Sequence, residues 1–275
     1  MTLPPNNTLR IVLLTLACLG SILSAGCAQK PWKQPLAEGA LPEAQQTIAE
    51  IQKRDAACTP CIDTEAKIFL RSNLQNQATS GYLQIQQPSF IKFIVSNPFG
   101  QPLLAVASDG INFQKVSTPE QVYMNGKVLS FVLKNDLPIA IVNGQWGAWL
   151  TGRLGKSTLD VKNIYEDEQN RGFWIATSYQ TPAGKYQEHL LINPQNKLLV
   201  GRMLTDQKDR ILANVQYSQS KDMDGCPQPE NLKITQLDFN TEIEINLADI
   251  QPLSSCSMAD FSLKRPDNFT HLYLP

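Results

Sequence analysis

Two apolar runs separated by a turn occupy residues 93–108, which read FIVSNPFGQPLLAVAS. Asn97–Gly100 places the turn, because proline fixes its own φ and glycine accepts the positive φ that tight turns require. Asp109-Gly110 follows at once and is a strong hairpin signal. The sequence therefore predicts three consecutive antiparallel strands here. They span Phe90–Val95, Leu103–Ser108 and Ile111–Val116.

The same alternation of short apolar runs and turns continues on both sides. Turn signals such as Pro88 and Asn193–Asn196 divide the chain at spacings near ten residues, and apolar and polar residues alternate strictly within Glu242–Leu247. Period-two alternation is typical of a half-buried strand. The further predicted strands are Ala66–Leu70, Gly81–Gln87, a short strand around Ile164, Phe173–Tyr179, Tyr186–Asn193, Lys197–Thr205, Ile211–Ser220, Glu230–Gln236 and Glu242–Asp249.

Helical signals are few. One segment has proline at its first position and apolar residues at offsets of three and four. A second begins with a capping box, Thr118–Gln121, and a third is followed by Gly144. The predicted helices are Pro42–Ala57, a short one from Thr118 to about Asn125, and a single turn at Pro138–Asn143.

So many strands with so few helices favour an α+β fold built on one strongly curved antiparallel sheet. A flat sheet needs elements packed on both faces, whereas a curved sheet can be filled by a few helices on its concave side. We therefore predict an incomplete β-barrel with helices against its concave face.

Three segments resemble the LolA/LolB-like superfamily of bacterial lipoproteins and lipoprotein-localisation factors, in its uncharacterised lipoprotein branch. They are 93–110, with the Pro-x-Gly turn and the Asp-Gly hairpin, 137–153, which is similar to the helical insertion of uncharacterised members, and 261–266, which is similar to the segment that ends those domains. The resemblance covers Ile62–Leu274. It implies a helical lid over an apolar cavity that holds acyl chains.

The first 26 residues have the layout of a secretory leader. One basic residue, Arg10, precedes the apolar run Ile11–Ile22, which is too short to span a bilayer. Small residues then lead to a cysteine in Leu23-Ser24-Ala25-Gly26-Cys27, which resembles the lipobox of bacterial lipoproteins. The alternative is a chance cysteine in an ordinary leader. The lipobox implies cleavage before Cys27 and acylation of that residue, and two or three acyl chains make a stable anchor.

These features divide the chain into a lipoprotein signal peptide at 1–26, a flexible tether at 27–41 that is rich in proline and glycine, and a single LolA/LolB-like domain at 42–275. Ala28, rather than aspartate, follows the predicted lipidation site. By the sorting rule of enteric lipoproteins, alanine favours the outer membrane. The predicted location is the bacterial cell envelope, lipid-anchored in the outer membrane and facing the periplasm.

The charge balance narrows the classes of partner. Without the leader the chain carries 23 basic and 25 acidic residues, a net charge of −2, with no block of like charges. This balance argues against a nucleic-acid surface or a polybasic membrane patch. The predicted partners are the membrane, reached through N-terminal acyl chains, and a lipid or another lipoprotein, with no nucleic acid.

Four cysteines remain beyond Cys27, namely Cys58, Cys61, Cys226 and Cys256. An even number in an exported chain predicts two disulfides. Three pairings are possible, and the most local joins Cys58 to Cys61 and Cys226 to Cys256. The first pair also fits a redox motif or half of a zinc site. However, a helical pattern precedes it where a redox motif needs a strand, and the chain has only two histidines to complete a zinc site.

Seven large apolar residues are candidates for the wall, mouth or lid of a ligand cavity. Two of the tryptophans are separated only by Gly147 and Ala148, which allow close approach of the backbone, and tryptophan suits sites with one apolar and one wet side. Ordinary core packing is the alternative for all seven. The candidates are Phe93, Phe113, Phe131, Trp146, Trp149, Leu150 and Trp174.

No sequence motif supports catalysis. The chain lacks a Gly-x-Ser-x-Gly nucleophile motif, and its two histidines, His189 and His271, stand apart from any catalytic pattern. We expect no enzyme activity, no cofactor and no bound metal. The predicted function is binding of an acyl chain or an acylated lipoprotein in an apolar cavity. The alternative is a structural or interaction subunit of an envelope assembly, with its cavity filled by its own side chains.

Replacing Cys27 with serine should abolish acylation, because serine lacks the sulfur that is diacylated. We expect an uncleaved precursor that is held only by its leader. Labelling of producing cells with radioactive palmitate measures this. Label in the Cys27→Ser chain would show that the lipobox interpretation is wrong.

Overall fold

The structure is a computed structural model that describes residues 30–73, 76–154, 159–181 and 184–275. Trp32–Pro275 forms one compact unit, and the helices and strands of the described residues belong to it. The predicted signal peptide and Cys27 lie outside the described residues. The unit Trp32–Pro275 holds both disulfides and every hydrophobic core cluster of the described chain.

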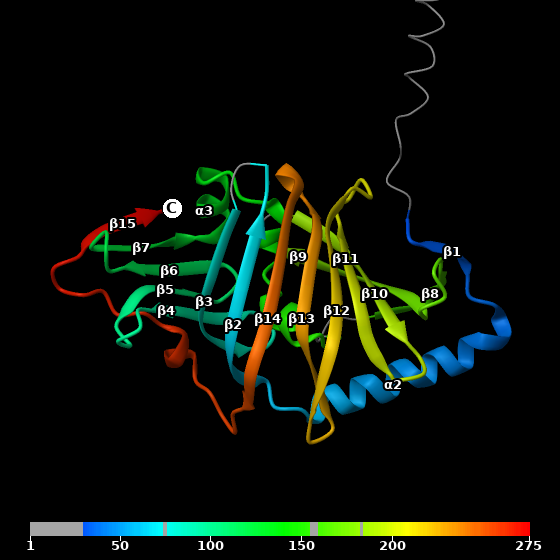
Figure 1. The fold of residues 1–275 in the computed structure, drawn as a ribbon. Coiled ribbons are helices and arrows are strands. Elements are labelled where there is room, and N and C mark those ends of the chain that lie inside the picture. Colours follow the sequence, from blue (N-terminus) through cyan, green and yellow to red (C-terminus); the bar gives the residue numbers. More distant parts are fainter. Residues whose placement is uncertain (1–29, 74–75, 155–158, 182–183) are drawn as a thin grey trace, which may run out of the picture. The chain divides into compact units, whose positions relative to one another are not determined.

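Most of the unit consists of strands (Figure 1). They are β1 (Trp32–Pro35), β2 (Cys61–Arg71), β3 (Asn76–Gln86), β4 (Phe90–Ser96), β5 (Pro102–Ser108), β6 (Asn112–Ser117), β7 (Val122–Lys127), β8 (Leu159–Asp167), β9 (Phe173–Thr181), β10 (Gly184–Asn193), β11 (Leu198–Thr205), β12 (Ile211–Met223), β13 (Cys226–Leu237), β14 (Thr241–Pro252) and β15 (Thr270–Leu274).

These strands form one open sheet, in the spatial order β1-β8-β9-β10-β11-β12-β13-β14-β2-β3-β4-β5-β6-β7-β15. Neighbouring strands are antiparallel except β7 and β15, which run parallel. The sheet is therefore mixed, and the prediction of a wholly antiparallel sheet is wrong at this edge. The parallel pairing arises because β15 is reached from β14 by a long connection, and such a connection can deliver a strand in either direction.

The helices are α2 (Leu41–Ala57), α3 (Val128–Lys134) and α4 (Trp146–Thr151), with 3-10 turns η1 (Glu38–Ala40), η2 (Ile139–Asn143), η3 (Asp238–Asn240) and η4 (Met258–Phe261). The predicted helix at Pro42–Ala57 is confirmed as α2. The predicted turn at Pro138–Asn143 is confirmed as η2, and Gly144 ends it with a left-handed φ of 72°. The sequence does not predict helices α3 and α4, because each is about two turns or less and too short to show a helical period.

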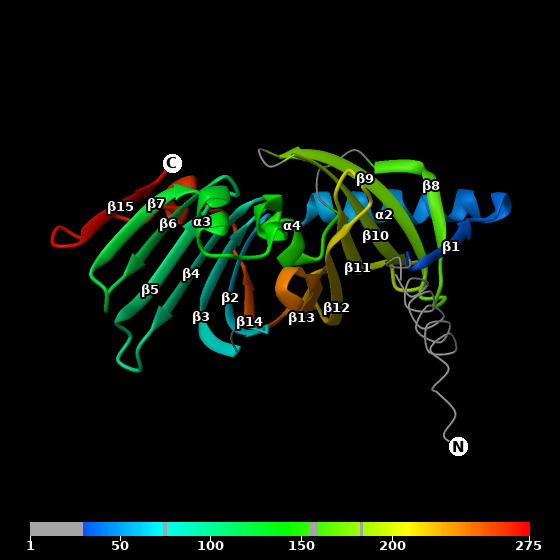
Figure 2. The ribbon, with the colours of Figure 1, turned by 90° about the horizontal axis from the view of Figure 1, so that it is seen from above.

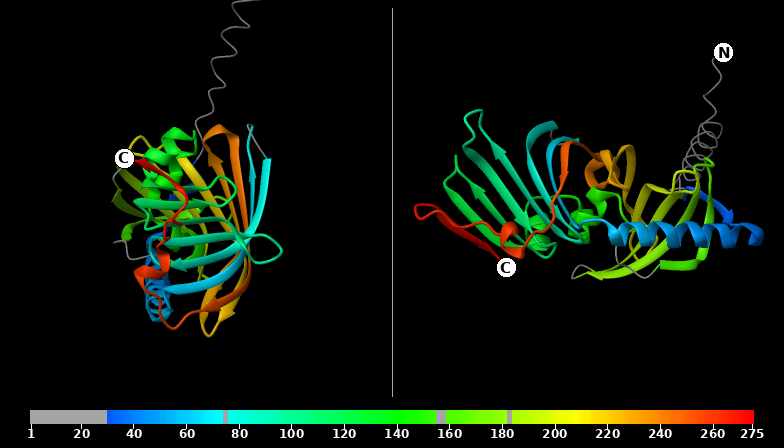
Figure 3. Two further views of the ribbon diagram at one scale, coloured as in Figure 1. Left: turned by 90° about the vertical axis from the view of Figure 1, so that its left-hand side faces the viewer. Right: turned by 90° about the horizontal axis from the view of Figure 1, so that it is seen from below.

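Helix α2 crosses the ends of strands on one part of the sheet, as the view from below shows (Figure 3). Its buried face consists of Ala44, Thr47, Ile48 and Ile51, and the three apolar residues of this face join the largest hydrophobic core cluster. In its last turn, Arg54 Nη1 donates a hydrogen bond of 2.8 Å to the carbonyl oxygen of Lys197, in the turn between β10 and β11. The helix thus closes one end of the packed core.

The helix predicted from Thr118 to Asn125 is wrong. Val122–Lys127 forms β7 and pairs in register with β6. In the sequence, Thr118 fits the N-cap of a helix. In the structure, its Oγ1 instead donates a hydrogen bond of 2.7 Å to the carbonyl oxygen of Pro102, at the start of β5. A hydrogen bond from Gln121 N to Thr118 O, at 3.2 Å, closes the turn between the two strands. Strand pairing here outweighs the local capping pattern.

Two edge strands have no counterpart among the predicted strands. Trp32–Pro35 lies within the predicted tether at 27–41, but it forms β1 and pairs with β8. The Trp32 ring packs against Trp174 and His189, with ring centroids 5.7 Å and 4.4 Å apart. This packing and the pairing with β8 together fix Trp32–Pro35 at the edge of the sheet. At the other edge β15 pairs with β7 along its whole length.

The segment between β14 and β15, residues 253–269, crosses the convex face of the sheet (Figure 1). Phe261 packs on Phe90, with ring centroids 5.6 Å apart. Lys92 Nζ donates to the carbonyl oxygen of Asp260 at 2.8 Å, and Leu263 N donates to Gln114 Oε1 at 2.6 Å. These contacts hold the segment against β4 and β6.

All four cysteines are in disulfides, as predicted, but the local pairing is wrong. Cys58 pairs with Cys226, with Cα atoms 5.7 Å apart, and Cys61 pairs with Cys256, with Cα atoms 6.1 Å apart. Cys58 follows the last turn of α2, whereas Cys61 begins β2, so the two side chains meet different neighbours. One bond joins α2 to the β12–β13 hairpin, and the other fixes the start of the convex segment to β2.

Tryptic digestion without reductant tests this pairing. The bonds should join three peptides, 55–67, 222–233 and 234–264, into one species, because the first contains Cys58 and Cys61 and each of the others contains one partner. Mass spectrometry detects the joined species. Recovery of 55–67 alone, with an internal bond, would contradict the structure.

Each disulfide closes a loop of well over 100 residues, for which chain entropy predicts up to about 5 kcal/mol of stabilisation.

Candidate functional site

The concave face of the sheet holds an open cavity of about 340 Å³. Strands β2 to β6, β13 and β14 form one wall, and α3, η2 and α4 form the other, within the curve of the sheet (Figure 2). The residues from strands are Ile68, Leu83, Ile91, Phe93, Val106, Ser108, Phe113, Lys115, Ile234, Ile243 and Ile245. The residues from the helical segments are Val128, Phe131, Ile141, Trp146 and Leu150.

The wall of the cavity is apolar at almost every position. Fourteen of its sixteen described lining residues are apolar, and the exceptions are Ser108 and Lys115. The alternation of side chains along a strand produces this wall, since residues two apart share a face. Ile91 and Phe93 of β4 and Ile243 and Ile245 of β14 follow that rule. Pockets that bind small ligands have volumes of roughly 300–1,000 Å³ and are mostly apolar, so the cavity suits an apolar ligand.

Helix α4 is held at the base of the cavity by close backbone contact. Ala148 N donates to the carbonyl oxygen of Pro88, at 3.0 Å, in the turn between β3 and β4. Gly147 permits this approach, because a Cβ there would lie 2.8 Å from the same oxygen. The Leu150 carbonyl accepts a hydrogen bond of 2.9 Å from the buried Gln228 amide. The helix therefore has a fixed place between β4 and β13.

The two tryptophans of α4 have different surroundings. Trp146 is half-buried, lines the cavity and donates from Nε1 to the carbonyl oxygen of Ile141 at 2.9 Å. Trp149 is 1% exposed and donates from Nε1 to Glu188 Oε1 at 3.0 Å. The rings touch, with centroids 5.5 Å apart. Trp146 thus faces the hollow, and Trp149 faces the packed core.

A buried ion pair lies behind Trp149. Arg202 Nη1 is 2.7 Å from Glu188 Oε1, and the side chains are 1% and 3% exposed. Arg202 also donates to the Tyr217 hydroxyl, at 3.1 Å, and to the carbonyl oxygen of Arg153, at 2.6 Å. Burial acts to lower the pKa of Arg202, but the Glu188 carboxylate and the Tyr217 hydroxyl together raise that pKa above its usual value. The Arg202 guanidinium therefore stays charged.

Sequence reasoning missed this ion pair. Its signal is a charged residue within each of two predicted strands, Glu188 in Tyr186–Asn193 and Arg202 in Lys197–Thr205. These strands are neighbours in a hairpin, and Leu190 pairs directly with Arg202. Two inward charges of opposite sign on adjacent strands predict a buried pair, because neither could be buried alone.

Five of the seven predicted cavity residues are brought together. Phe93, Phe113, Phe131, Trp146 and Leu150 line the cavity. Trp149 and Trp174 do not, and both are buried in packed core.

Trp174 belongs to a separate small cluster with Leu191 and Met203. Its Nε1 donates to Asp167 Oδ1 at 2.8 Å. The Asp167 carboxylate also forms an ion pair of 2.9 Å with Arg171. Desolvation acts to raise the pKa of Asp167, but the hydrogen bonds from Arg171 and Trp174 lower it overall. Trp174 therefore has a structural partner and lies outside the cavity.

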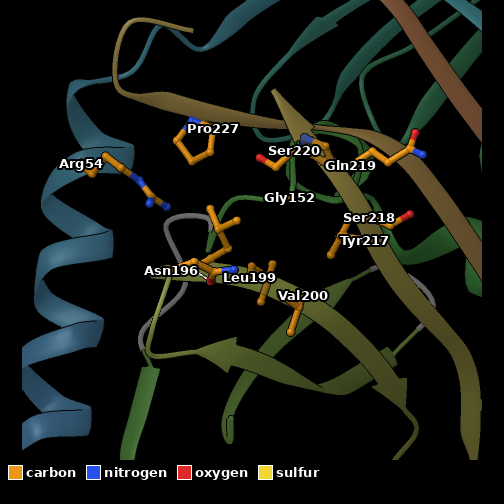
Figure 4. Close-up of a pocket in the computed structure, with 12 residues that line it drawn as sticks. Arg54, Gly152, Asn196, Leu199, Val200, Tyr217, Ser218, Gln219, Ser220 and Pro227 are labelled. Atoms are coloured by element: carbon orange, nitrogen blue, oxygen red, sulfur yellow. Dashed lines mark hydrogen bonds between the residues drawn. The ribbon is translucent and has the colours of Figure 1, made fainter. Parts of the chain in front are cut away.

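A second pocket, of about 230 Å³, lies between α2 and strands β11 to β13 (Figure 4). Polar residues such as Asn196, Ser218 and Ser220 line much of it. The positively charged side chain in its lining, Arg54, already has partners. It donates a hydrogen bond of 2.8 Å to the Lys197 carbonyl oxygen and forms an ion pair of 3.1 Å with Asp55. Leu198, Leu199 and Val200 also line the pocket, so its wall is mixed rather than apolar.

The described part of the chain contains no cluster of three or more histidine, cysteine, aspartate or glutamate side chains that could hold a metal ion. Within the same residues, no helix has the length and apolar character needed to cross a membrane.

No protein-family model matches the chain, and no curated protein matches it. Among solved structures the chain is similar to a DUF1329 family protein from Desulfovibrio piger, at 12% identity and a TM-score of 0.55, over 81% of this chain and 97% of that one. It is also similar to a LolA superfamily protein from Nitrosomonas europaea, at 11% identity and a TM-score of 0.50, over 80% and 97%. The chain has a LolA/LolB-like fold, as its sequence resemblance predicted.

The two tryptophans of α4 should differ in their effect on stability. Trp149→Ala should lower the free energy of unfolding by about 3 to 5 kcal/mol, because it leaves a void in packed core. Trp146→Ala should cost less, about 1 to 2 kcal/mol, because that ring already faces open volume. Urea unfolding of the unit Trp32–Pro275 measures both. Equal costs would contradict the assignment of Trp149 to the core and Trp146 to the cavity wall.

Proposed function

We propose that this protein binds an acyl chain, of a lipid or of an acylated lipoprotein, in the cavity of the concave face, without chemical turnover. The observation that carries the proposal is an open volume of about 340 Å³ whose wall is apolar at fourteen of sixteen residues. Ligand pockets bury most of an apolar ligand against walls of this kind. A hydrocarbon chain is the ligand that such a wall suits.

Burial of the chain supplies the binding energy. Each buried methylene contributes about 0.8 kcal/mol, so several of them outweigh the cost of ordering a flexible tail. The proposed contacts are Phe93 and Phe113 from the sheet, and Phe131, Trp146 and Leu150 from the helical side, with other lining residues. No covalent step is required, and release needs only that the chain withdraws.

The segment formed by α3 and η2 acts, in this proposal, as a lid. Phe131 and Ile141 turn toward the cavity, whereas Leu133 on the far side of α3 is 65% exposed. The segment packs on the smaller cluster that contains Phe113 and Val132. Helix α4 is the fixed base, because its backbone is hydrogen-bonded to the sheet. Movement of α3 and η2 alone would widen the cavity.

The site of action follows from the predicted lipobox. Acylation of Cys27 would anchor the chain to a membrane of the bacterial envelope, and Ala28 favours the outer membrane. A short tether would then keep the binding unit in the periplasm, close to acylated molecules. This anchor and the acyl cavity are separate proposals about two parts of the chain, and each can be tested alone.

Lipid extracted from the purified unit Trp32–Pro275 and identified by mass spectrometry tests the proposal directly. Displacement of the neutral fluorophore N-phenylnaphthylamine by palmitate gives the affinity. Val106→Trp and Ile243→Trp should each weaken palmitate binding about tenfold or more, because the indole takes the place of at least two methylenes at about 0.8 kcal/mol each.

Leu133→Trp is the matched control, since the same ring is added at an exposed position of α3. It should leave the affinity unchanged, and all three variants should keep the wild-type thermal midpoint. A unit that carries no lipid and binds no palmitate would refute the proposal. The alternative, an interaction subunit that binds no lipid, would then stand.

A further inference from the structure

Among the described residues that line the cavity, only Lys115 carries a charge. It lies on β6 two residues after Phe113, so both side chains share the concave face. Apolar residues flank it on both neighbouring strands, because Val106 of β5 and Met124 of β7 are its register partners. Lysine in such surroundings costs energy unless an anion is near.

The only carboxylate in ion-pair distance of Lys115, among the residues that the structure describes, is weakly held. Glu120 Oε2 lies 3.5 Å from Lys115 Nζ, and the Glu120 side chain is 59% exposed. An exposed pair of this kind contributes about 0–1 kcal/mol. A ligand could therefore replace Glu120 at little cost. The lysine itself is only 25% exposed, so a ligand anion there would be partly screened from water.

The other polar lining residue is already used by the sheet. Ser108 Oγ donates to the Asn112 carbonyl oxygen at 2.8 Å and accepts from Gly110 N at 3.0 Å. It holds the turn between β5 and β6, and its hydrogen-bonding capacity is largely satisfied. Recognition of a polar group on the ligand therefore falls to Lys115.

We propose that the cavity selects lipids with an anionic head group, a carboxylate or a phosphate, which pairs with Lys115 while the tail lies against the apolar wall. This inference rests on the proposed function, since it assumes that an acyl chain enters the cavity. It adds that a neutral acylated end binds less well than an acid of the same length. Hydrogen bonds to charged groups are the strong ones, so one such contact changes affinity measurably.

Comparison of an acid with its ester tests the inference. On the unit Trp32–Pro275, palmitate should displace N-phenylnaphthylamine at about one tenth of the concentration needed for methyl palmitate, a difference of about 1.4 kcal/mol. Lys115→Met should remove this preference by weakening palmitate about tenfold and leaving the ester unchanged. Lys115→Arg should restore it, because arginine keeps the charge at this position.

Lys67→Met is the matched control. Lys67 is exposed and stands on β2, on the face opposite to Ile68, which lines the cavity. The same loss of charge there should change neither affinity. Glu120→Gln should leave palmitate binding equal or tighter, since it removes the competing carboxylate.

Two further competitors separate the possible sources of the anion. Lysophosphatidylglycerol carries a phosphate without a compensating charge, and lysophosphatidylcholine carries one with a neighbouring cation. Competition by the first in preference to the second, lost in Lys115→Met, would identify phospholipids as ligands. Competition by palmitate alone would identify free fatty acids. Either result supports the inference.

The outcomes separate this inference from the proposed function. If wild type binds palmitate and methyl palmitate equally, and Lys115→Met alters neither, the cavity binds acyl chains but does not select a charge, and the inference is wrong. If wild type binds neither, acyl binding itself is wrong. If Lys115→Met weakens acid and ester alike, the lysine acts through the shape of the wall, which also overturns the inference.

Discussion

The attachment of α4 to the sheet is the constraint on which the cavity depends. The helix meets the β3–β4 turn through the hydrogen bond from Ala148 N to the Pro88 carbonyl, and it meets the packed core through Trp149. Trp149 donates to Glu188, which pairs with Arg202 where neither side chain reaches water. Removing α4 would take a hydrogen bond from a buried carboxylate, and such losses cost far more than exposed ones. The helix therefore cannot sink into the hollow.

The contrast between the two sides of α4 shows how one sheet serves two purposes. On one side, α2 and strands β10 to β12 bury Ile48, Ile51 and Leu190 almost completely, and the disulfide from Cys58 to Cys226 fixes the end of α2. On the other side, strands β4 to β6 face only short helical segments, and open volume remains. The packed part supplies stability, and the hollow part can hold an open apolar surface because its helical cover rests on that stable base.

The convex face is covered by an irregular segment of the chain rather than by helices. The segment 253–269 begins at the Cys61–Cys256 disulfide, places Phe261 on Phe90 and ends in β15, which adds a parallel strand to β7. Strands β4 to β6 thus have contacts on both faces although no long helix of the described chain packs on either. This cover keeps the curved sheet in shape around the cavity without filling it. A partly exposed lysine, Lys115, is then the only formal charge among the described residues of an apolar wall.

The sequence by itself determined most of the strands and the long helix, because these follow from local signals. The alternation in Glu242–Leu247, the Asp109-Gly110 hairpin and the apolar spacing in α2 act over a few residues. Five of the seven candidate residues line the cavity, and two of these, Phe93 and Phe113, lie on the sheet, where strand alternation turns them to the concave face.

Only the tertiary structure decided the turn at Thr118, the pairing of the cysteines and the different surroundings of the two tryptophans. Thr118 bonds to the distant Pro102 carbonyl, which turned a capping pattern into a strand turn. Cys58 and Cys61 point to partners 168 and 195 residues away, a choice that sequence spacing cannot show. Trp146 and Trp149 are alike in sequence, yet one faces the hollow and the other a buried carboxylate. Each outcome was set by which segments meet in space, and that depends on the packing of the whole sheet.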